Sequence, residues 1–95
     1  MASALVSITY DLDDGWGEVK KAAFEGPFFN IIETSNGRKQ APNTTLFVYN
    51  LTPADALAAF DTAVSTASRR LGKKITVQKV FAARAEDWRI RSDQP

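Results

Sequence analysis

Three aspartates lie close together near the N-terminus: Asp11, Asp13 and Asp14. The chain has no histidine and no cysteine, which removes the usual general base at neutral pH, the commonest zinc ligand and any thiol nucleophile. Chemistry in this protein would therefore depend on carboxylates, hydroxyls and lysines. Hard cations such as Mg²⁺ and Mn²⁺ prefer oxygen ligands, so an aspartate held on a rigid element is the first candidate for a metal site.

Asp11 has such a rigid base in the sequence. Residues 4–14 alternate apolar and more polar side chains with a period of two, which predicts a strand that ends in acid. A metal bound by Asp11 would activate water and neutralise charge on a phosphate, whereas the structural alternative is that Asp11 only caps the turn. Asp13 and Asp14 are weaker candidates because they lie beyond the strand, and Asp14 is expected to cap the next helix.

The remaining elements follow from periodicity and from turn residues. We expect helices at 15–26 and 53–71, strands at 28–34, 44–50 and 75–83, and a loop at 35–43 that contains the turn signal Asn36-Gly37. The helix at 53–71 is the clearest, because Thr52 can cap it and Gly72 can close it in a left-handed conformation. Lys79 interrupts the apolar face of the last strand, which indicates a bulge, an edge or a change of environment.

The element order strand, helix, strand, strand, helix, strand predicts a single α+β domain over residues 1–95. Two split βαβ units give the ferredoxin-like βαββαβ arrangement, a four-stranded antiparallel sheet with both helices on one face. We expect Phe47 and Tyr49 on the other face, where exposed aromatic side chains would indicate a partner. Residues 86–95 form a C-terminal tail in which Trp88 and Ile90 are expected to dock onto a surface.

The net charge of +1 gives no general attraction to polyanions, so nucleic-acid binding would need a local patch. Candidate phosphate contacts are Arg38 and Lys39 in the loop and four cations around the end of the second helix: Arg69, Arg70, Lys73 and Lys74. The alternative is that these four complement the helix dipole. No apolar run reaches roughly 18 residues, and no basic region precedes the first apolar run, so we predict a cytoplasmic protein without a membrane partner.

The element order, the small size, the open aromatic sheet and the strand ending Tyr10-Asp11-Leu12 resemble the CRISPR-associated small endoribonuclease family and its relatives, the virulence-associated D proteins. The resemblance implies a homodimer that packs sheet against sheet, with Asp11 near the two-fold axis facing its mate. It also implies that the paired aspartates bind Mg²⁺ or Mn²⁺ for hydrolysis of RNA or DNA, although some members are structural dimers. We expect four residues at the dimer interface: Tyr10, Phe47, Tyr49 and Trp88.

Two classes of function remain open from the sequence. The first is a nuclease-like protein, a metal-dependent endonuclease with Asp11 as catalytic metal ligand. The second is a non-catalytic dimeric binding or assembly protein in which the carboxylates are structural. A third, a subunit that binds a small ligand on the open sheet, is also compatible with the pattern. The observation that separates the first two is whether two Asp11 carboxylates approach each other across an interface.

Overall fold

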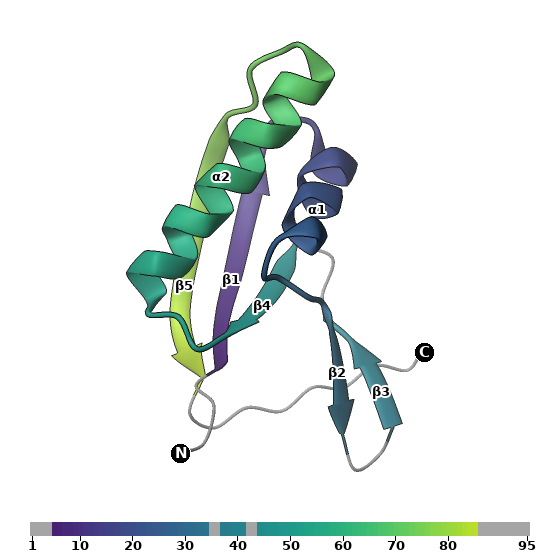
Figure 1. Cartoon of the computed structure of the whole chain (residues 1–95), viewed down its shortest axis with the longest axis vertical. Helices are drawn as coiled ribbons and strands as arrows, with labels where there is room; N and C mark the ends of the chain where they lie inside the picture. Colours follow the sequence, from purple (N-terminus) through teal and green to yellow (C-terminus); the bar gives the residue numbers. More distant parts are fainter. Residues whose placement is uncertain (1–4, 35–36, 42–43, 86–95) are drawn as a thin grey trace.

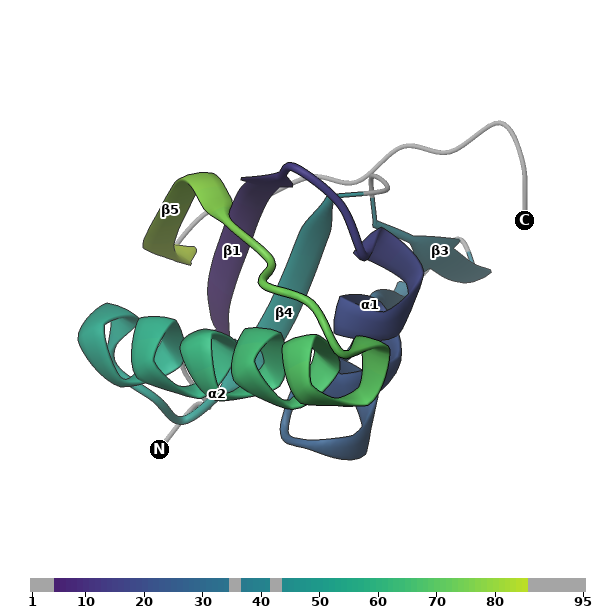
Figure 2. The same ribbon diagram turned by 90° about the horizontal axis from the view of Figure 1, so that it is seen from above.

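The computed structural model of the chain describes residues 5–34, 37–41 and 44–85. Over these residues the elements are β1 (Leu5–Leu12), α1 (Trp16–Glu25), β2 (Ile31–Thr34), β3 (Gly37–Gln40), β4 (Thr45–Tyr49), α2 (Pro53–Leu71) and β5 (Val77–Ala85). Strands β4, β1 and β5 form an antiparallel sheet with β1 in the centre. Both helices lie on one face of this sheet (Figures 1 and 2). The predicted α+β class is confirmed.

Helix α2 begins and ends where the sequence predicts. The Thr52 hydroxyl accepts a hydrogen bond from the backbone N–H of Asp55 at 3.1 Å, and Pro53 takes the first helical position, where a missing N–H costs nothing. At the other end Gly72 adopts a left-handed conformation with φ of 67°, which is easy for a residue without Cβ. Its buried face contributes five residues to the core: Ala56, Phe60, Ala63, Val64 and Ala67.

Helix α1 has a different start from the one expected. Its N-cap is Gly15, in a left-handed conformation with φ of 75°, and no side chain caps the helix. The prediction that Asp14 is the cap is therefore wrong. The Asp14 carboxylate instead accepts the N–H of Gly15 at 2.7 Å and forms an ion pair with Lys73, which follows α2. The helix ends as predicted at Gly26, whose N–H donates to the carbonyls of Ala22 and Ala23.

The core lies between the helices and the sheet. Alternate residues of β1 face the helices and are buried: Val6, Ile8, Tyr10 and Leu12. The ring of Tyr10 lies 4.8 Å from that of Phe60 and 6.1 Å from that of Trp16. With 3% of its surface exposed, Tyr10 is a core residue of its own chain.

A four-stranded sheet is not confirmed, because β2 leaves the sheet. Phe29 pairs with Phe47 of β4 through two backbone hydrogen bonds of 2.9 and 2.8 Å, at the position of a fourth strand. From Ile31 the chain pairs with β3 instead and forms a separate antiparallel hairpin, which extends away from the main sheet in Figure 1. The predicted loop thus contains strand β3, whose sequence GRKQ has no apolar alternation that would have revealed it.

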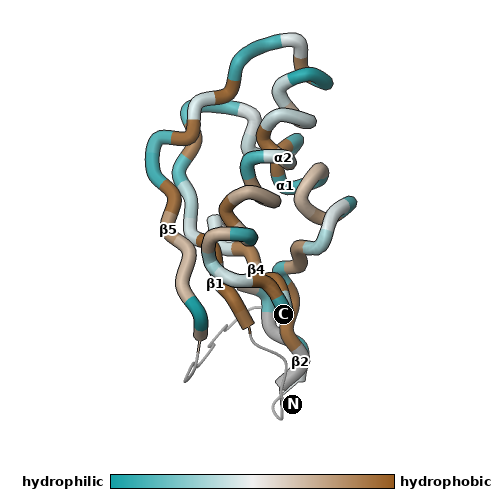
Figure 3. Tube along the Cα trace, turned by 60° about the vertical axis from the view of Figure 1, so that its left-hand side comes forward, coloured by the Kyte–Doolittle hydropathy of each residue, from teal (hydrophilic) through white to brown (hydrophobic). Residues whose placement is uncertain are grey.

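Strand β5 has the irregularity that Lys79 indicated. Leu12 of β1 is opposite Val77, whereas Asp11 is opposite Lys79, so Gln78 is an extra residue in a bulge. Figure 3 shows hydrophilic residues interrupting the hydrophobic ones of β5. Because side chains alternate between faces, one extra residue reverses the faces beyond it. Val77 and Ala82 pack on the core below the helices, while Phe81 faces the opposite side of the sheet.

The face without helices, which we call the open face, has an apolar part and a polar part. In its apolar part Leu5 and Phe47 form a buried cluster with Ile32 and Ala41 of the hairpin segment. Phe47 is only 9% exposed because Phe29 packs against it with ring centroids 5.9 Å apart, so its expected exposure is wrong. Tyr49 is 45% exposed as predicted, although its ring stacks on that of Phe29 at 5.2 Å.

Candidate functional site

The polar part of the open face contains Asp11. Strand β1 ends at Leu12, and Asp11 lies exposed beside that end, next to the edge strand β5. The bulge at Gln78 sets the register so that Lys79 is directly opposite Asp11. Cross-strand partners in a sheet have their side chains on the same face. A carboxylate and an ammonium group therefore share this end of the open face.

A hollow of about 410 Å³ lies at the same place. Its lining combines hydroxyl, carboxylate, ammonium and aromatic groups: Thr9, Tyr10, Asp11, Thr44, Lys79, Val80 and Phe81. Phe81 is 68% exposed. Thr44 is held at the rim because its carbonyl accepts the N–H of Tyr10 at 3.0 Å. The hollow is shallow and open, and it is large enough to receive a large side chain from another molecule.

These residues do not by themselves make a site for a divalent cation. No group of three or more His, Cys, Asp or Glu side chains that could hold a metal occurs in the described part of the chain. The polar groups around Asp11 are the hydroxyls of Thr9 and Thr44 and the cationic Lys79. Asp11 is the one carboxylate among the described lining residues, and the cation opposite it disfavours metal binding, since a metal site gains its affinity from negative ligands. Among the described residues, the lining of the hollow has no second carboxylate.

Asp13, the next carboxylate, has a structural role. Its Oδ1 accepts the N–H of Thr76 at 2.8 Å, and its own N–H donates to the Thr76 carbonyl at 3.1 Å. This pair ties the end of β1 to the segment that leads into β5. Asp14 is paired with Lys73, which holds the pKa of its carboxyl below the usual range, mainly through their hydrogen bond. The structure therefore does not bring the three neighbouring aspartates together into one site.

Two of the four cations in the predicted basic group around the end of α2 pair with acidic side chains. Arg70 donates to Glu25 through Nη1 at 2.5 Å and Nη2 at 3.3 Å, and its Nη1 lies 3.6 Å from Glu18. Lys73 pairs with Asp14. Arg69 donates to the Thr66 hydroxyl at 3.5 Å, and Lys74 is exposed. Two of the four cations thus join α2 to α1 and its preceding turn, which is a structural role.

The other candidates lie on or beyond the hairpin. Arg38 and Lys39 are both in β3, and Arg38 is exposed. They belong to a different sheet from Asp11 and are not part of the lining of the hollow. Trp88 and Ile90, expected to dock from the tail, lie outside the described residues.

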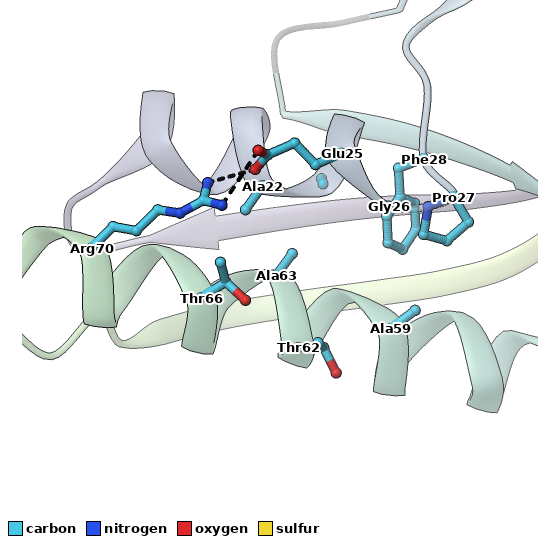
Figure 4. Close-up of a pocket in the computed structure, with 11 residues that line it drawn as sticks. Ala22, Glu25, Gly26, Pro27, Phe28, Ala59, Thr62, Ala63, Thr66 and Arg70 are labelled. Carbon is cyan, nitrogen blue, oxygen red and sulfur yellow. Dashed lines mark hydrogen bonds and ion pairs between the residues drawn. The ribbon is translucent and has the colours of Figure 1, made fainter.

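A second hollow, of about 420 Å³, lies between α1 and α2 (Figure 4). Its walls are mostly small side chains, including Ala22, Ala59 and Ala63. The polar groups at one end are Glu25 and Arg70, which bind each other, as the dashed lines in Figure 4 show. The groove therefore offers packing space between the helices and little chemistry of its own.

Sequence reasoning missed Lys79 and Phe81 as members of the candidate site. The four apolar residues at 80–83 carry no alternation that fixes which of them face the core. The one signal was the break at Lys79, from which a bulge could be predicted but not its direction.

Comparison with known proteins does not identify a family: no family description, curated protein or solved structure gave a match to this chain. Within the described residues, no helix is both long and apolar enough to cross a membrane.

Proposed function

We propose that this protein is a non-catalytic dimeric binding or assembly protein, in which two copies of a ferredoxin-like domain join through their open faces. The observation that carries the proposal is the uneven cover of the sheet. Both helices pack on one face, while the other presents Phe81 at 68% and Tyr49 at 45% exposure. Apolar surface is worth roughly 25 cal/mol per Å² when it leaves water, so a second sheet is a fitting cover for the ring of Phe81.

The ferredoxin-like part of the proposal is supported by the strand order. β4-β1-β5 corresponds to three neighbouring strands of that arrangement, and the pairing of Phe29 with Phe47 marks the position of the fourth. The local hairpin then takes the chain away from the sheet. The non-catalytic part is supported by the surroundings of Asp11. Among the described residues Lys79 lies opposite it, at a place where a metal site would need further carboxylates.

The experiment is a measurement of mass in solution. Sedimentation equilibrium or light scattering at micromolar concentration should give twice the chain mass of 10.4 kDa. Phe81→Asp should shift the protein to the monomer because a charge would be placed inside the interface. Phe24→Asp is the matched control, since Phe24 is 42% exposed but lies on α1. A wild-type protein that stays at 10.4 kDa up to high micromolar concentration contradicts the proposal.

A second candidate is a metal-dependent endonuclease, and the position of Asp11 favours it. The carboxylate is exposed beside the end of the central strand and borders a hollow that a phosphodiester could enter. The second carboxylate would come from the partner's Asp11, and Arg38, Lys39 and Lys74 would contact RNA or DNA phosphates. The test is cleavage of single-stranded RNA and duplex DNA with Mg²⁺ or Mn²⁺. Activity that disappears in Asp11→Asn while the dimer persists supports this candidate, and equal activity in both proteins removes it.

A further inference from the structure

We infer that in this dimer β1 of each copy lies over β5 of the other, so that Asp11 pairs with the partner's Lys79 and Lys79 with the partner's Asp11. The inference rests on the proposed dimer and specifies its interface. It assigns Asp11 an electrostatic role between protomers, and it assigns the hollow an occupant, the ring of the partner's Phe81. Neither role requires a metal.

The first support is the distribution of charge on the open face. The sheet residues that share this face are Leu5, Ser7, Thr9 and Asp11 on β1, Thr45, Phe47 and Tyr49 on β4, and Lys79, Phe81, Ala83 and Ala85 on β5. Asp11 and Lys79 are the one acid and the one base among them, at neighbouring positions of one end. Among the described residues neither forms an ion pair. Such a face is self-complementary in charge, which a two-fold interface requires.

The second support is geometric. When two sheets face each other about a two-fold axis that runs along the strands, each residue meets a partner residue at the same height. An axis along β1 would place the two Asp11 carboxylates opposite each other, and an axis along β5 would do the same with the two Lys79 ammonium groups. An axis midway between β1 and β5 instead places Asp11 of each copy opposite Lys79 of the other, so the dimer contains this contact twice. Like charges held close together inside an interface cost free energy, so the midway axis is favoured.

The third support is the shape of the surface at the same height. Thr9 and Phe81 are directly opposite in the β1–β5 ladder, one row from Asp11 and Lys79. The midway axis therefore places the Phe81 ring over the partner's Thr9, a small side chain in the lining of the hollow. A protruding ring and a hollow of about 410 Å³ on the same face match each other in an isologous contact.

The test is a charge exchange followed by the dimer dissociation constant, measured by sedimentation or by dilution of a fluorescently labelled protein. Asp11→Lys and Lys79→Asp should each raise the dimer dissociation constant at least about tenfold. Each substitution turns both copies of the ion pair into a contact between like charges. The double variant should regain most of the wild-type affinity. Asp61→Lys, an exposed position on α2, is the control for a change of net charge and should leave the constant unchanged.

Asp11→Asn distinguishes this interface from the alternative in which the two Asp11 carboxylates face each other. Loss of an ion pair weakens the dimer, whereas relief of repulsion between two Asp11 carboxylates tightens it. A wild-type dimer that is unaffected or tightened by Asp11→Asn, or a double variant as weak as the singles, overturns the inference and leaves the proposed dimer standing. A wild-type monomer overturns the proposed dimer itself. Circular dichroism of each variant confirms that exposed substitutions have kept the fold.

Discussion

Asp13 and Thr76 hold each other by two hydrogen bonds, although 63 positions separate them in the chain: the N–H of Thr76 donates to Asp13 Oδ1 at 2.8 Å, and the N–H of Asp13 donates to the Thr76 carbonyl at 3.1 Å. Together these bonds fasten the end of β1 to the approach of β5, just beyond the bulge. The bulge in turn sets which residue lies opposite Asp11. The stability of this corner therefore bears on the geometry of the candidate site.

Asp13→Ala should lower the free energy of unfolding by about 1 kcal/mol, because the Thr76 N–H loses its acceptor. Asp13→Asn keeps an acceptor oxygen at the same place and should recover most of the loss. Urea unfolding followed by circular dichroism measures both. Equal losses in the two variants would show that the charge of Asp13, and not its hydrogen bond, is what matters.

Acid should weaken the contact between α1 and α2. Hydrogen bonding to Arg70 lowers the pKa of Glu25, and hydrogen bonding to Lys73 lowers that of Asp14. A carboxyl whose folded pKa is depressed contributes stability above its unfolded pKa, roughly 4, and loses that contribution as the pH falls through the lower folded value. All of these side chains are on the surface, so salt should reduce the effect.

Glu25→Gln provides the measurement for this pH dependence. The difference in unfolding free energy between wild type and Glu25→Gln should be largest near neutral pH and should shrink toward zero as the pH falls well below 4. Glu18→Gln, which removes the longer contact with Arg70 at 3.6 Å, should show a smaller difference. A difference that stays constant between pH 7 and pH 2 would mean that Glu25 stabilises through packing and not through its charge.

The hydroxyl of Tyr10 is buried without a hydrogen-bond partner among the described groups. Leaving such a group unpaired costs about 1–3 kcal/mol, so Tyr10→Phe should keep the stability of the protein or raise it by about 1 kcal/mol. Burial also raises the pKa of this hydroxyl. The wild type should therefore lose stability relative to Tyr10→Phe as the pH rises above roughly 10, where the unfolded tyrosine ionises first.

Thermal unfolding at pH 7 and pH 10.5 tests both parts of the Tyr10 prediction. The ring contacts with Phe60 and Trp16 are kept in Tyr10→Phe, so loss of packing does not obscure the result. A variant that melts well below the wild type at pH 7 would show that the hydroxyl has a bonding partner after all.

The elements that the sequence predicts well are those with strong local signals. Helix α2 has a capping threonine, a proline at its first position and a closing glycine, and its predicted bounds are the observed ones. The alternation in β1 likewise predicts a strand that ends beside Asp11. In both cases residues near each other in the chain decide the outcome.

The parts that were missed depend on competition between distant segments. Residues 31–34 can either extend the main sheet along the exposed edge of β4 or form a local hairpin with β3. Both arrangements satisfy backbone hydrogen bonds, so the competition between them decides the outcome. The direction of the bulge in β5 depends on which of residues 80–83 fit beneath the helices. For that reason Asp11 could be named from the sequence, whereas Lys79 and Phe81 could not.

The last prediction concerns Gly15 and Gly72, which both adopt left-handed conformations, with φ of 75° and 67°. A side chain at either position costs about 1 kcal/mol or more in backbone strain. At Gly72 a Cβ would meet nothing within 4 Å, whereas at Gly15 it would lie 2.6 Å from Cδ1 of Ile75. Gly15→Ala should therefore lower the free energy of unfolding clearly more than Gly72→Ala does.

Ile75→Val tests the cause of that difference, because valine lacks the Cδ1 atom that the new Cβ would meet. The expected cost of Gly15→Ala is smaller in the Ile75→Val background than in the wild type, while the cost of Gly72→Ala is the same in both. Urea unfolding of the single and double variants gives the coupling free energy directly. If Gly15→Ala costs as much in either background, backbone strain alone explains it, and the turn between β1 and α1 needs no close contact with Ile75.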